Sequence, residues 1–162
     1  MIFEAQTEWI APDNFPNLKG YKTISIDLET RDPDLKSKGS GAVIGNGEII
    51  GVAVAVDGWC KYYPFGHEGG GNLDKKKILE WVKSVCATEA TKIFHNAMYD
   101  VCWLRSYGIK INGHIVDTMV MASLVNENRM RYTLNALSWE YLGERKSEAT
   151  LIEVAKNWGI DA

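Results

Sequence analysis

Apolar and polar residues alternate along Tyr21–Leu28, and this period of two predicts a β-strand with one buried face. Two further apolar runs, Glu48–Val56 and Trp59–Pro64, flank an Asp-Gly pair at positions 57–58, which is a strong signal for a hairpin turn. A short apolar run, Thr91–His95, predicts a fourth, buried strand. The chain thus begins with three strands joined by tight turns and adds another strand later.

Apolar residues at helical spacing mark most of the remaining chain. In Leu73–Ala87 the apolar side chains gather on one side and four lysines lie elsewhere, which we interpret as a solvated face rather than a nucleic-acid site. The expected helices are Leu73–Ala87, Asn96–Tyr107, Asp117–Val125, Thr133–Leu142 and Ala149–Trp158. This order predicts an α/β fold with a mixed sheet: three antiparallel strands, then parallel strands, flanked by helices.

Glycine and polar residues fill the segments between these elements. Residues 1–20 are expected to form an irregular lead-in that Trp9 and Phe15 anchor to the body. His67 beside Glu68 could form a ligand pair, but we favour a surface loop. The expected loops are 31–47, 66–72 and 126–132.

The length of 162 residues, with 46% hydrophobic and 24% charged residues, fits one globular domain. A net charge of −3 argues against a protein that coats duplex nucleic acid electrostatically, although phosphate contacts through bound metal ions remain open. No run approaches the roughly 20 apolar residues of a membrane span, and the first residues lack signal-peptide features. Three widely spaced cysteines, Cys60, Cys86 and Cys102, favour reduced thiols in a cytoplasmic protein.

Two carboxylates end the first strand. Side chains alternate across a strand, so Asp27 and Glu29 point to one side and Leu28 to the other. Two acids aimed together repel each other unless a cation lies between them, and Mg²⁺ and Mn²⁺ prefer such oxygen ligands. The alternative is a strand that runs into a solvated acidic turn, since Arg-Asp-Pro-Asp follows at 31–34.

A second acidic signal follows the fourth strand. Asn96 and Asp100 lie four residues apart at the start of the expected helix, so they share one helix face and can address the same spot. The alternative is that Asn96 caps the helix and Asp100 is a surface acid.

The two signals together resemble the first and second motifs of the DnaQ-like (DEDD) 3′–5′ exonucleases, and most closely those in the proofreading domains of family A DNA polymerases. Two later segments also resemble that family: the Asp-Thr pair at 117–118 and the helix with its following Tyr-Leu-Gly at 132–143. The matching segments are Ile26–Thr30, His95–Asp100, 117–118 and 132–143. The resemblance covers residues 21–158 and implies a ribonuclease H-like fold, with 21–162 as the exonuclease domain.

The resemblance also implies roles for individual residues. It implies a catalytic and metal-binding set consisting of Asp27, Glu29 and Asp100. It places Thr30 near the 3′-terminal nucleotide, gives Leu28 a backbone or packing contact with it, and has Asn96 steady the scissile phosphate region. Tyr99 is expected in the core, and Asp117 is expected to cap its own helix rather than support the site.

The implied function is metal-dependent hydrolysis of single-stranded DNA from the 3′ end, releasing 5′-mononucleotides. Two divalent ions, Mg²⁺ or Mn²⁺, held about 4 Å apart can activate the attacking water and stabilise the leaving oxygen. The implied partners are a single-stranded DNA 3′ end and a DNA polymerase domain or subunit, with no membrane. Two alternatives stay open: a ribonuclease of the same superfamily that trims RNA 3′ ends, and a non-catalytic polymerase-associated module.

The family's third motif, Tyr or His four residues before a ligand Asp, is missing from the sequence. No acid after Asp100 has Tyr or His four residues before it. His114 is a weak substitute because its spacing is wrong. We expect the fourth carboxylate to come from outside these 162 residues, whether the sequence is a truncated piece, a fragment of a polymerase or one product of a split gene.

Overall fold

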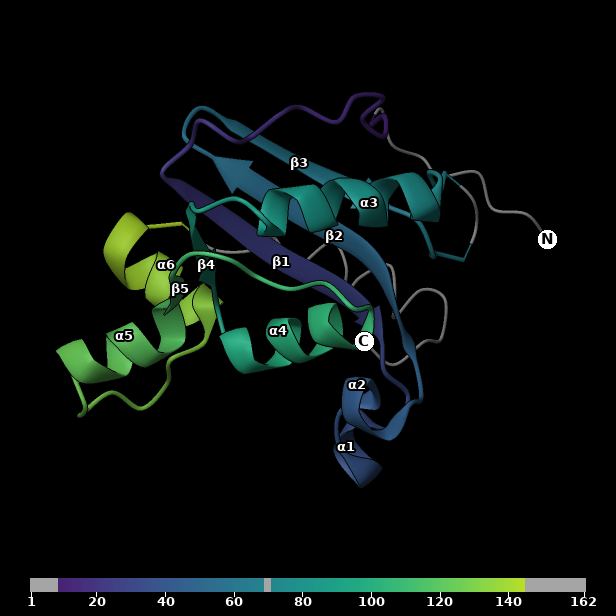
Figure 1. Ribbon diagram of the computed structural model, residues 1–162. Coiled ribbons are helices and arrows are strands. Elements are labelled where there is room, and N and C mark those ends of the chain that lie inside the picture. The colour runs from purple at the N-terminus through teal and green to yellow at the C-terminus, as the bar shows by residue number, and fades with distance from the viewer. Residues whose placement is uncertain (1–8, 69–70, 145–162) are drawn as a thin grey trace. The chain divides into compact units, whose positions relative to one another are not determined.

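The computed structural model describes residues 9–68 and 71–144, and its centre is a five-stranded sheet with the order β3-β2-β1-β4-β5 (Figure 1). β1 pairs antiparallel with β2, and β2 with β3, while β4 runs parallel to β1 and β5 parallel to β4. The bounds are β1 Thr23–Arg31, β2 Glu48–Val56, β3 Trp59–Pro64, β4 Thr91–Phe94 and β5 Ile115–Asp117. The predicted fold class, three antiparallel strands followed by parallel ones, is confirmed.

One face of the sheet forms the hydrophobic core. Alternate residues of β1, Ile24, Ile26 and Leu28, are buried there, as the period of two predicted. Helix α3, Lys75–Cys86, crosses this face and contributes the buried side chains Ile78, Trp81, Val82 and Val85 (Figure 1). Burying an aliphatic side chain of this size stabilises a fold by about 1.5–3 kcal/mol, so this packing fixes the orientation of β1.

Aromatic contacts attach the lead-in to the core face. The rings of Phe15 and Tyr63 stack with centroids 5.5 Å apart, and the Tyr63 hydroxyl donates to the carbonyl of Asn14 at 2.9 Å. The Trp81 indole donates to the carbonyl of Pro16 at 2.9 Å. Residues 9–20 contain no helix or strand. Of the two expected anchors, Phe15 packs against Tyr63 and Trp81, and the Trp9 ring lies with its centroid 6.3 Å from that of Tyr62.

Helix α4, Ala97–Ser106, lies beside the part of β1 that extends beyond its pairing with β4. The β1–β4 pairing runs only from Thr23 to Ser25 of β1, and β4 ends at Phe94. The edge of β1 beyond Ser25 is therefore open to α4 rather than to another strand. Two contacts bring the first turn of α4 to the acidic end of β1: Asp100 accepts from the Leu28 amide, and the hydroxyls of Tyr99 and Thr30 are hydrogen-bonded.

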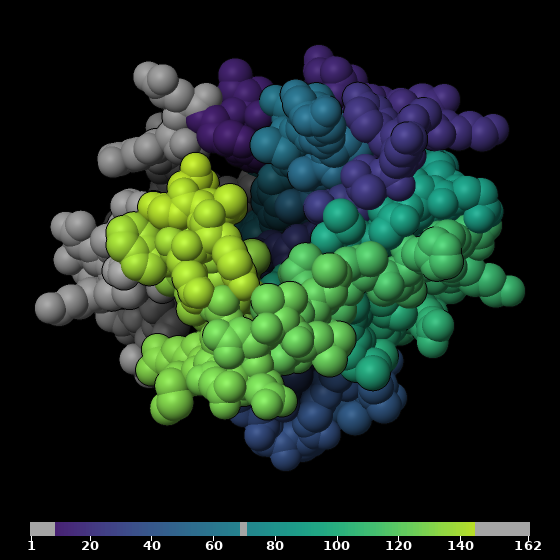
Figure 2. Space-filling model, turned by 90° about the vertical axis from the view of Figure 1, so that its left-hand side faces the viewer, coloured from purple at the N-terminus to yellow at the C-terminus, as the bar shows by residue number. Residues whose placement is uncertain are grey.

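The segment predicted as a loop at 31–47 contains two single-turn helices, α1 Leu35–Lys38 and α2 Gly41–Ile44, so that prediction is partly wrong. They lie at the carboxyl end of β1 and appear in blue at the bottom of Figure 2. The Asp32 carboxylate accepts hydrogen bonds from the Gly41 amide at 3.0 Å to each oxygen, and this contact starts α2. A side-chain bond across nine positions leaves no periodic signal in the sequence.

A second compact unit begins at Met119 and is described by itself. It holds most of α5, Thr118–Val125, and all of α6, Leu134–Leu142, which the Thr133 hydroxyl caps by accepting from the Ala136 amide. Both helices were predicted within one residue. The expected helix at 149–158 lies outside the described residues. None of the helices in the described ranges is long and apolar enough to cross a bilayer.

Candidate active site

The two acids of β1 lie on the sheet face opposite the core. Asp27 and Glu29 are exposed, whereas Leu28 between them is buried with 8% of its surface exposed. Asp27 pairs laterally with Ala53 of β2, and Glu29 pairs with Gly51. The strand thus presents both carboxylates over a neighbouring strand of small residues, as the alternating pattern predicted.

An unusual backbone conformation turns the chain from β4 into α4. Asn96 has φ 67°, and it is the one non-glycine residue with a positive φ in the described ranges. Asn96 occupies the N-cap position of α4, as one alternative expected, but its side chain makes no capping hydrogen bond. Asparagine is among the residues that tolerate this left-handed region.

The carboxylate of Asp117 caps α4 from the end of β5. It accepts hydrogen bonds from the amides of Asn96, at 3.1 Å, and Ala97, at 2.8 Å. We expected Asp117 to cap its own helix, and the structure shows that it caps the start of α4, because Phe94 and Asp117 are neighbours in the parallel β4–β5 pair. Asp117 therefore fixes the helix that carries Asp100.

Asp100 reaches β1 from the first turn of α4. It is buried, with 4% of its surface exposed, and its Oδ1 accepts a hydrogen bond from the Leu28 amide at 3.0 Å. Burial raises the pKa of Asp100 to about 7; the Leu28 hydrogen bond opposes this rise, and the charge of Asp27 adds to it. The interpretation of Asp100 as a surface acid is therefore wrong, and the structure brings it next to the acidic strand.

Thr30 and Tyr99 tie the end of β1 to α4 and α2. The two hydroxyls lie 2.7 Å apart, and Tyr99 also donates to the Asp32 carboxylate at 3.0 Å. Thr30 follows a register shift between Glu29 and itself, which redirects its side chain. Tyr99 is half-buried, so the prediction that it belongs to the core is only partly confirmed.

The chemistry of this donor set suits a hard cation. Asp27 and Glu29 supply carboxylate oxygens on an open face, and Asp100 is a buried acid whose ionisation the charge of Asp27 opposes. A cation beside these groups would relieve that repulsion. No three Asp, Glu, His or Cys side chains within 9–68 and 71–144 are already arranged as a metal-holding group.

His114 lies away from these acids along the strands. It is exposed and precedes β5, where its carbonyl accepts from the Lys92 amide. The acids lie toward the carboxyl ends of β1 and β4, and His114 lies at the amino end of β5. His114 therefore lies too far along the strands to complete the acidic site.

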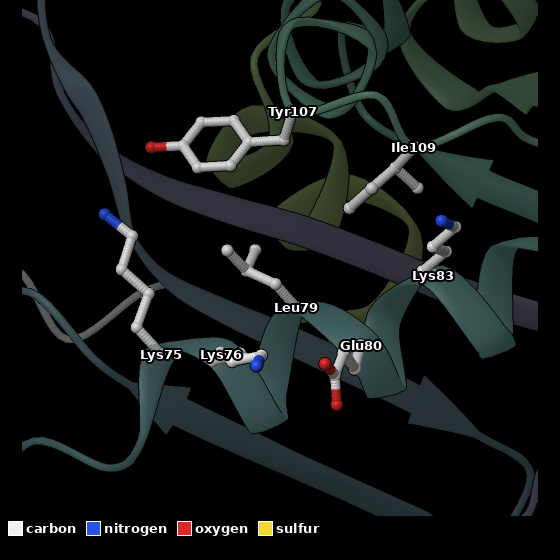
Figure 3. A pocket seen from close by; sticks show the side chains of 7 residues that line it. All are labelled: Lys75, Lys76, Leu79, Glu80, Lys83, Tyr107 and Ile109. Atoms are coloured by element: carbon white, nitrogen blue, oxygen red, sulfur yellow. The ribbon is translucent and has the colours of Figure 1, made fainter.

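A separate groove of about 420 Å³ runs along α3 (Figure 3). Its lining residues are Lys75, Lys76, Leu79, Glu80, Lys83, Tyr107 and Ile109. Lys75 forms an ion pair with Glu48 at 2.8 Å, so one of the three lysines in the groove is already neutralised. The groove contains none of the acids of β1 or α4.

Sequence reasoning missed Tyr62 of β3, which shares the open face with Asp27. Ala53 pairs with Asp27 on one side and with Tyr62 on the other, so the three residues form one row across the sheet. The register of the predicted hairpin at 57–58 could have placed Tyr62 opposite Ala53. The row connects β3 to the acidic strand.

Known proteins resemble this chain in sequence and fold. A model of the 3′–5′ exonuclease family matches residues 5–162. The DNA-directed DNA polymerase of Pseudomonas phage M6 is 33% identical over 96% of this chain and 24% of its own length. The chain spans about a quarter or less of the length of the curated relatives it matches.

Solved nuclease structures share the fold. Brucella melitensis NrnC with bound Mg²⁺ superposes with a TM-score of 0.58 and 18% identity, over 85% of this chain and 61% of that one. Escherichia coli RNase D, an exoribonuclease, superposes with a TM-score of 0.56 and 14% identity, over 81% of this chain and 30% of that one. The chain thus shares the mixed-sheet, ribonuclease H-like fold of these structures. With the family match over residues 5–162, the chain belongs to the 3′–5′ exonuclease family, as a DnaQ-like domain of the kind associated with DNA polymerases.

Proposed function

We propose that this chain removes nucleotides from the 3′ end of single-stranded DNA by metal-dependent hydrolysis, as the proofreading domain of a DNA polymerase. The observation that carries the proposal is the hydrogen bond from the Leu28 amide to Asp100. It joins the two motifs of the exonuclease family, 72 positions apart, at one edge of β1. The family match supports the reaction class.

In this proposal Asp27, Glu29 and Asp100 hold two divalent ions, Mg²⁺ or Mn²⁺. Such ions, when bound, lower the pKa of an attacking water and stabilise the departing 3′ oxygen. The chain's own part is to hold three carboxylates in place: two on the rigid strand β1 and one on α4, whose start Asp117 fixes.

Leu28, Thr30 and Asn96 are proposed to contact the nucleic acid. The Leu28 side chain is buried, which favours a backbone role for that residue. The Thr30 hydroxyl is hydrogen-bonded to Tyr99. Thr30 would therefore contact the nucleic acid because it lies at the end of β1, and not through a free hydroxyl. Asn96 leaves its side chain exposed beside Asp117, where it can reach a phosphate oxygen.

DNA is favoured over RNA because the curated relatives are DNA polymerases. The nucleases NrnC and RNase D share only the fold at 18% and 14% identity. A polymerase, in the same chain or another, is the proposed partner. Matched DNA and RNA oligonucleotides of one sequence separate the two substrates directly.

The test is digestion of a 5′-labelled single-stranded oligonucleotide in Mn²⁺. We expect a ladder that shortens from the 3′ end, release of 5′-mononucleotides and complete arrest by EDTA. Asp27→Asn should abolish the reaction because it removes one negative ligand without changing side-chain size. Internal cuts, or digestion that continues in Asp27→Asn, would contradict the proposal.

Asp13→Asn is the matched control for this experiment. Asp13 is an exposed aspartate of the lead-in, and the same chemical change there should leave the rate unaltered. Both variants should keep the melting temperature of the parent within a few degrees, since neither residue is buried.

A further inference from the structure

Tyr62 lies on the open face of the sheet, at the end of the row that begins with Asp27. In this register Asp27 pairs with Ala53, and Ala53 pairs with Tyr62. Residues paired laterally in a sheet share a face. Ala53, between the acid and the tyrosine in this row, carries only a methyl group, and the Trp9 ring packs against Tyr62 with centroids 6.3 Å apart.

Gly51 makes room for the Tyr62 side chain to lie across β2. A Cβ at Gly51 would lie 1.9 Å from the Tyr62 hydroxyl oxygen and 2.5 Å from its ring carbon Cζ. Gly51 is also the lateral partner of Glu29. The hydroxyl of Tyr62 therefore stands over the residue that pairs with Glu29, on the side of the second acid.

His67 holds this hydroxyl in place. The Tyr62 hydroxyl and His67 Nε2 are hydrogen-bonded, and the two rings meet edge to face with centroids 5.8 Å apart. Asn72 fixes the His67 backbone, accepting from its amide at 2.8 Å and donating to its carbonyl at 2.6 Å. The segment at 66–72, predicted as a surface loop, thus carries a histidine held toward the acidic face.

The direction of the Tyr62–His67 hydrogen bond follows from the neighbouring charges. A phenol has one proton, so Tyr62 donates either to His67 or toward the acids. Burial raises the pKa of Tyr62 to about 12, and the charges of Glu29 and Asp27 add to the rise, so both acids act on this hydroxyl. Two negative charges attract the positive end of the O–H dipole.

We propose that Tyr62 is a positioning residue of the acidic site: His67 donates from Nε2 to the Tyr62 oxygen, and the Tyr62 hydroxyl donates to the carboxylate of Glu29. Glu29 is exposed and has three side-chain torsions, so a donor of fixed position narrows its conformations. The consequence for metal binding rests on the proposed function, whereas the hydrogen-bond direction does not. Outer partners of metal ligands typically change metal affinity about 10- to 100-fold.

The hydrogen-bond direction is tested by ¹⁵N NMR of His67 in the metal-free protein at pH 8. The expected result is a proton on Nε2 of His67, and a smaller preference for that tautomer in Glu29→Gln. A ring with Nε2 unprotonated would overturn the proposal, since Tyr62 would then donate to His67 rather than to Glu29.

The positioning role is tested by titrating Mn²⁺ with electron paramagnetic resonance. Tyr62→Phe should weaken Mn²⁺ binding about 10- to 100-fold. Tyr63→Phe is the matched control: it loses the same group one residue away, but Tyr63 faces the core and its hydroxyl donates to Asn14. The control should bind Mn²⁺ like the parent, and melting curves check that both variants are folded.

The outcomes separate the two proposals. Equal Mn²⁺ affinity in Tyr62→Phe and the parent overturns the positioning role and leaves the exonuclease proposal intact. A parent protein that binds no Mn²⁺ contradicts the metal-dependent function and with it the consequence for affinity. The tautomer of His67 still decides the hydrogen-bond direction in that case.

Discussion

Asp100 is a buried acid that the folded chain prefers to keep protonated. Burial raises its pKa to about 7, far above the ordinary value of 3.8, despite the hydrogen bond from the Leu28 amide. A group whose pKa is raised on folding contributes stability that is complete below the unfolded-state pKa. That contribution is lost as the pH rises through the folded-state pKa. The metal-free protein should therefore lose stability between about pH 4 and pH 7 from this residue.

Asp100→Asn should raise the melting temperature of the metal-free protein at pH 8. The amide oxygen can still accept from Leu28, and no charge is buried. At about 1.4 kcal/mol per pKa unit, the gain has an upper limit of about 4 kcal/mol. Calorimetry at pH 5 and pH 8 measures it, with Asp13→Asn as the exposed control. If the variant melts at the same temperature as the parent at pH 8, or lower, the ionised Asp100 does not destabilise the fold.

The same acid makes metal binding pH-dependent if Asp100 is a ligand, as proposed. A ligand carboxylate must lose its proton, so Mn²⁺ affinity should rise with pH up to and just beyond the folded-state pKa of about 7. The measurement is the Mn²⁺-induced rise in melting temperature at pH 5.5, 6.5 and 7.5. A rise that is independent of pH would exclude Asp100 from the ligands.

At the scale of elements, the junction between β4 and α4 positions Asp100, one of the proposed site residues. Asp117 bonds two amides of this junction, and Asn96 takes the left-handed conformation there. All three residues of β5 pair with β4, and this pairing brings Asp117 to the start of α4. The position of Asp100 thus depends on a residue 17 positions further along the chain.

Asp117→Ala should lower the free energy of unfolding by about 0.5–2 kcal/mol, the usual range for a lost helix cap. Asn96→Gly should be tolerated far better, because glycine adopts a positive φ without steric cost. Denaturant unfolding of the two variants compares them directly. A larger loss in Asn96→Gly than in Asp117→Ala would mean that the Asn96 side chain, rather than the cap, holds the junction.

Elements with a regular pattern could be predicted from the sequence, and elements formed by distant contacts could not. The bounds of β2 and β3 were predicted to the residue, because apolar runs flank an Asp-Gly turn. β5 was not predicted as a strand, since three residues carry no period and its hydrogen bonds come from β4. Similarly, the acids of both motifs were visible, and the hairpin register could have placed Tyr62 opposite Ala53. The cap by Asp117 and the pairing of Ala53 with Asp27 could not be predicted, because they join segments far apart in the sequence.

At the scale of the whole molecule, the chain corresponds to a minor part of its relatives. It spans 24% of the Pseudomonas phage M6 polymerase and 21% of the Salmonella phage PMBT28 polymerase. The 162 residues supply Asp27, Glu29 and Asp100, and no Tyr or His lies four residues before a later acid. By the family resemblance, a fourth carboxylate and a residue that orients the water would come from another segment.

A polypeptide in which a segment with Tyr-x-x-x-Asp follows these residues should therefore hydrolyse DNA faster than the 162 residues alone. The loss of one positioned acid–base group commonly costs about 10²–10⁴ in rate, and a missing metal ligand adds to it. Single-turnover digestion at saturating Mn²⁺ compares the two, and the same longer polypeptide with Asn in place of the motif's Asp is the matched control. That control should fall back toward the rate of the 162 residues, because only the carboxylate is lost. Equal rates for all three would mean that the acids of β1 and α4 are sufficient and that the third motif has no role in this chain.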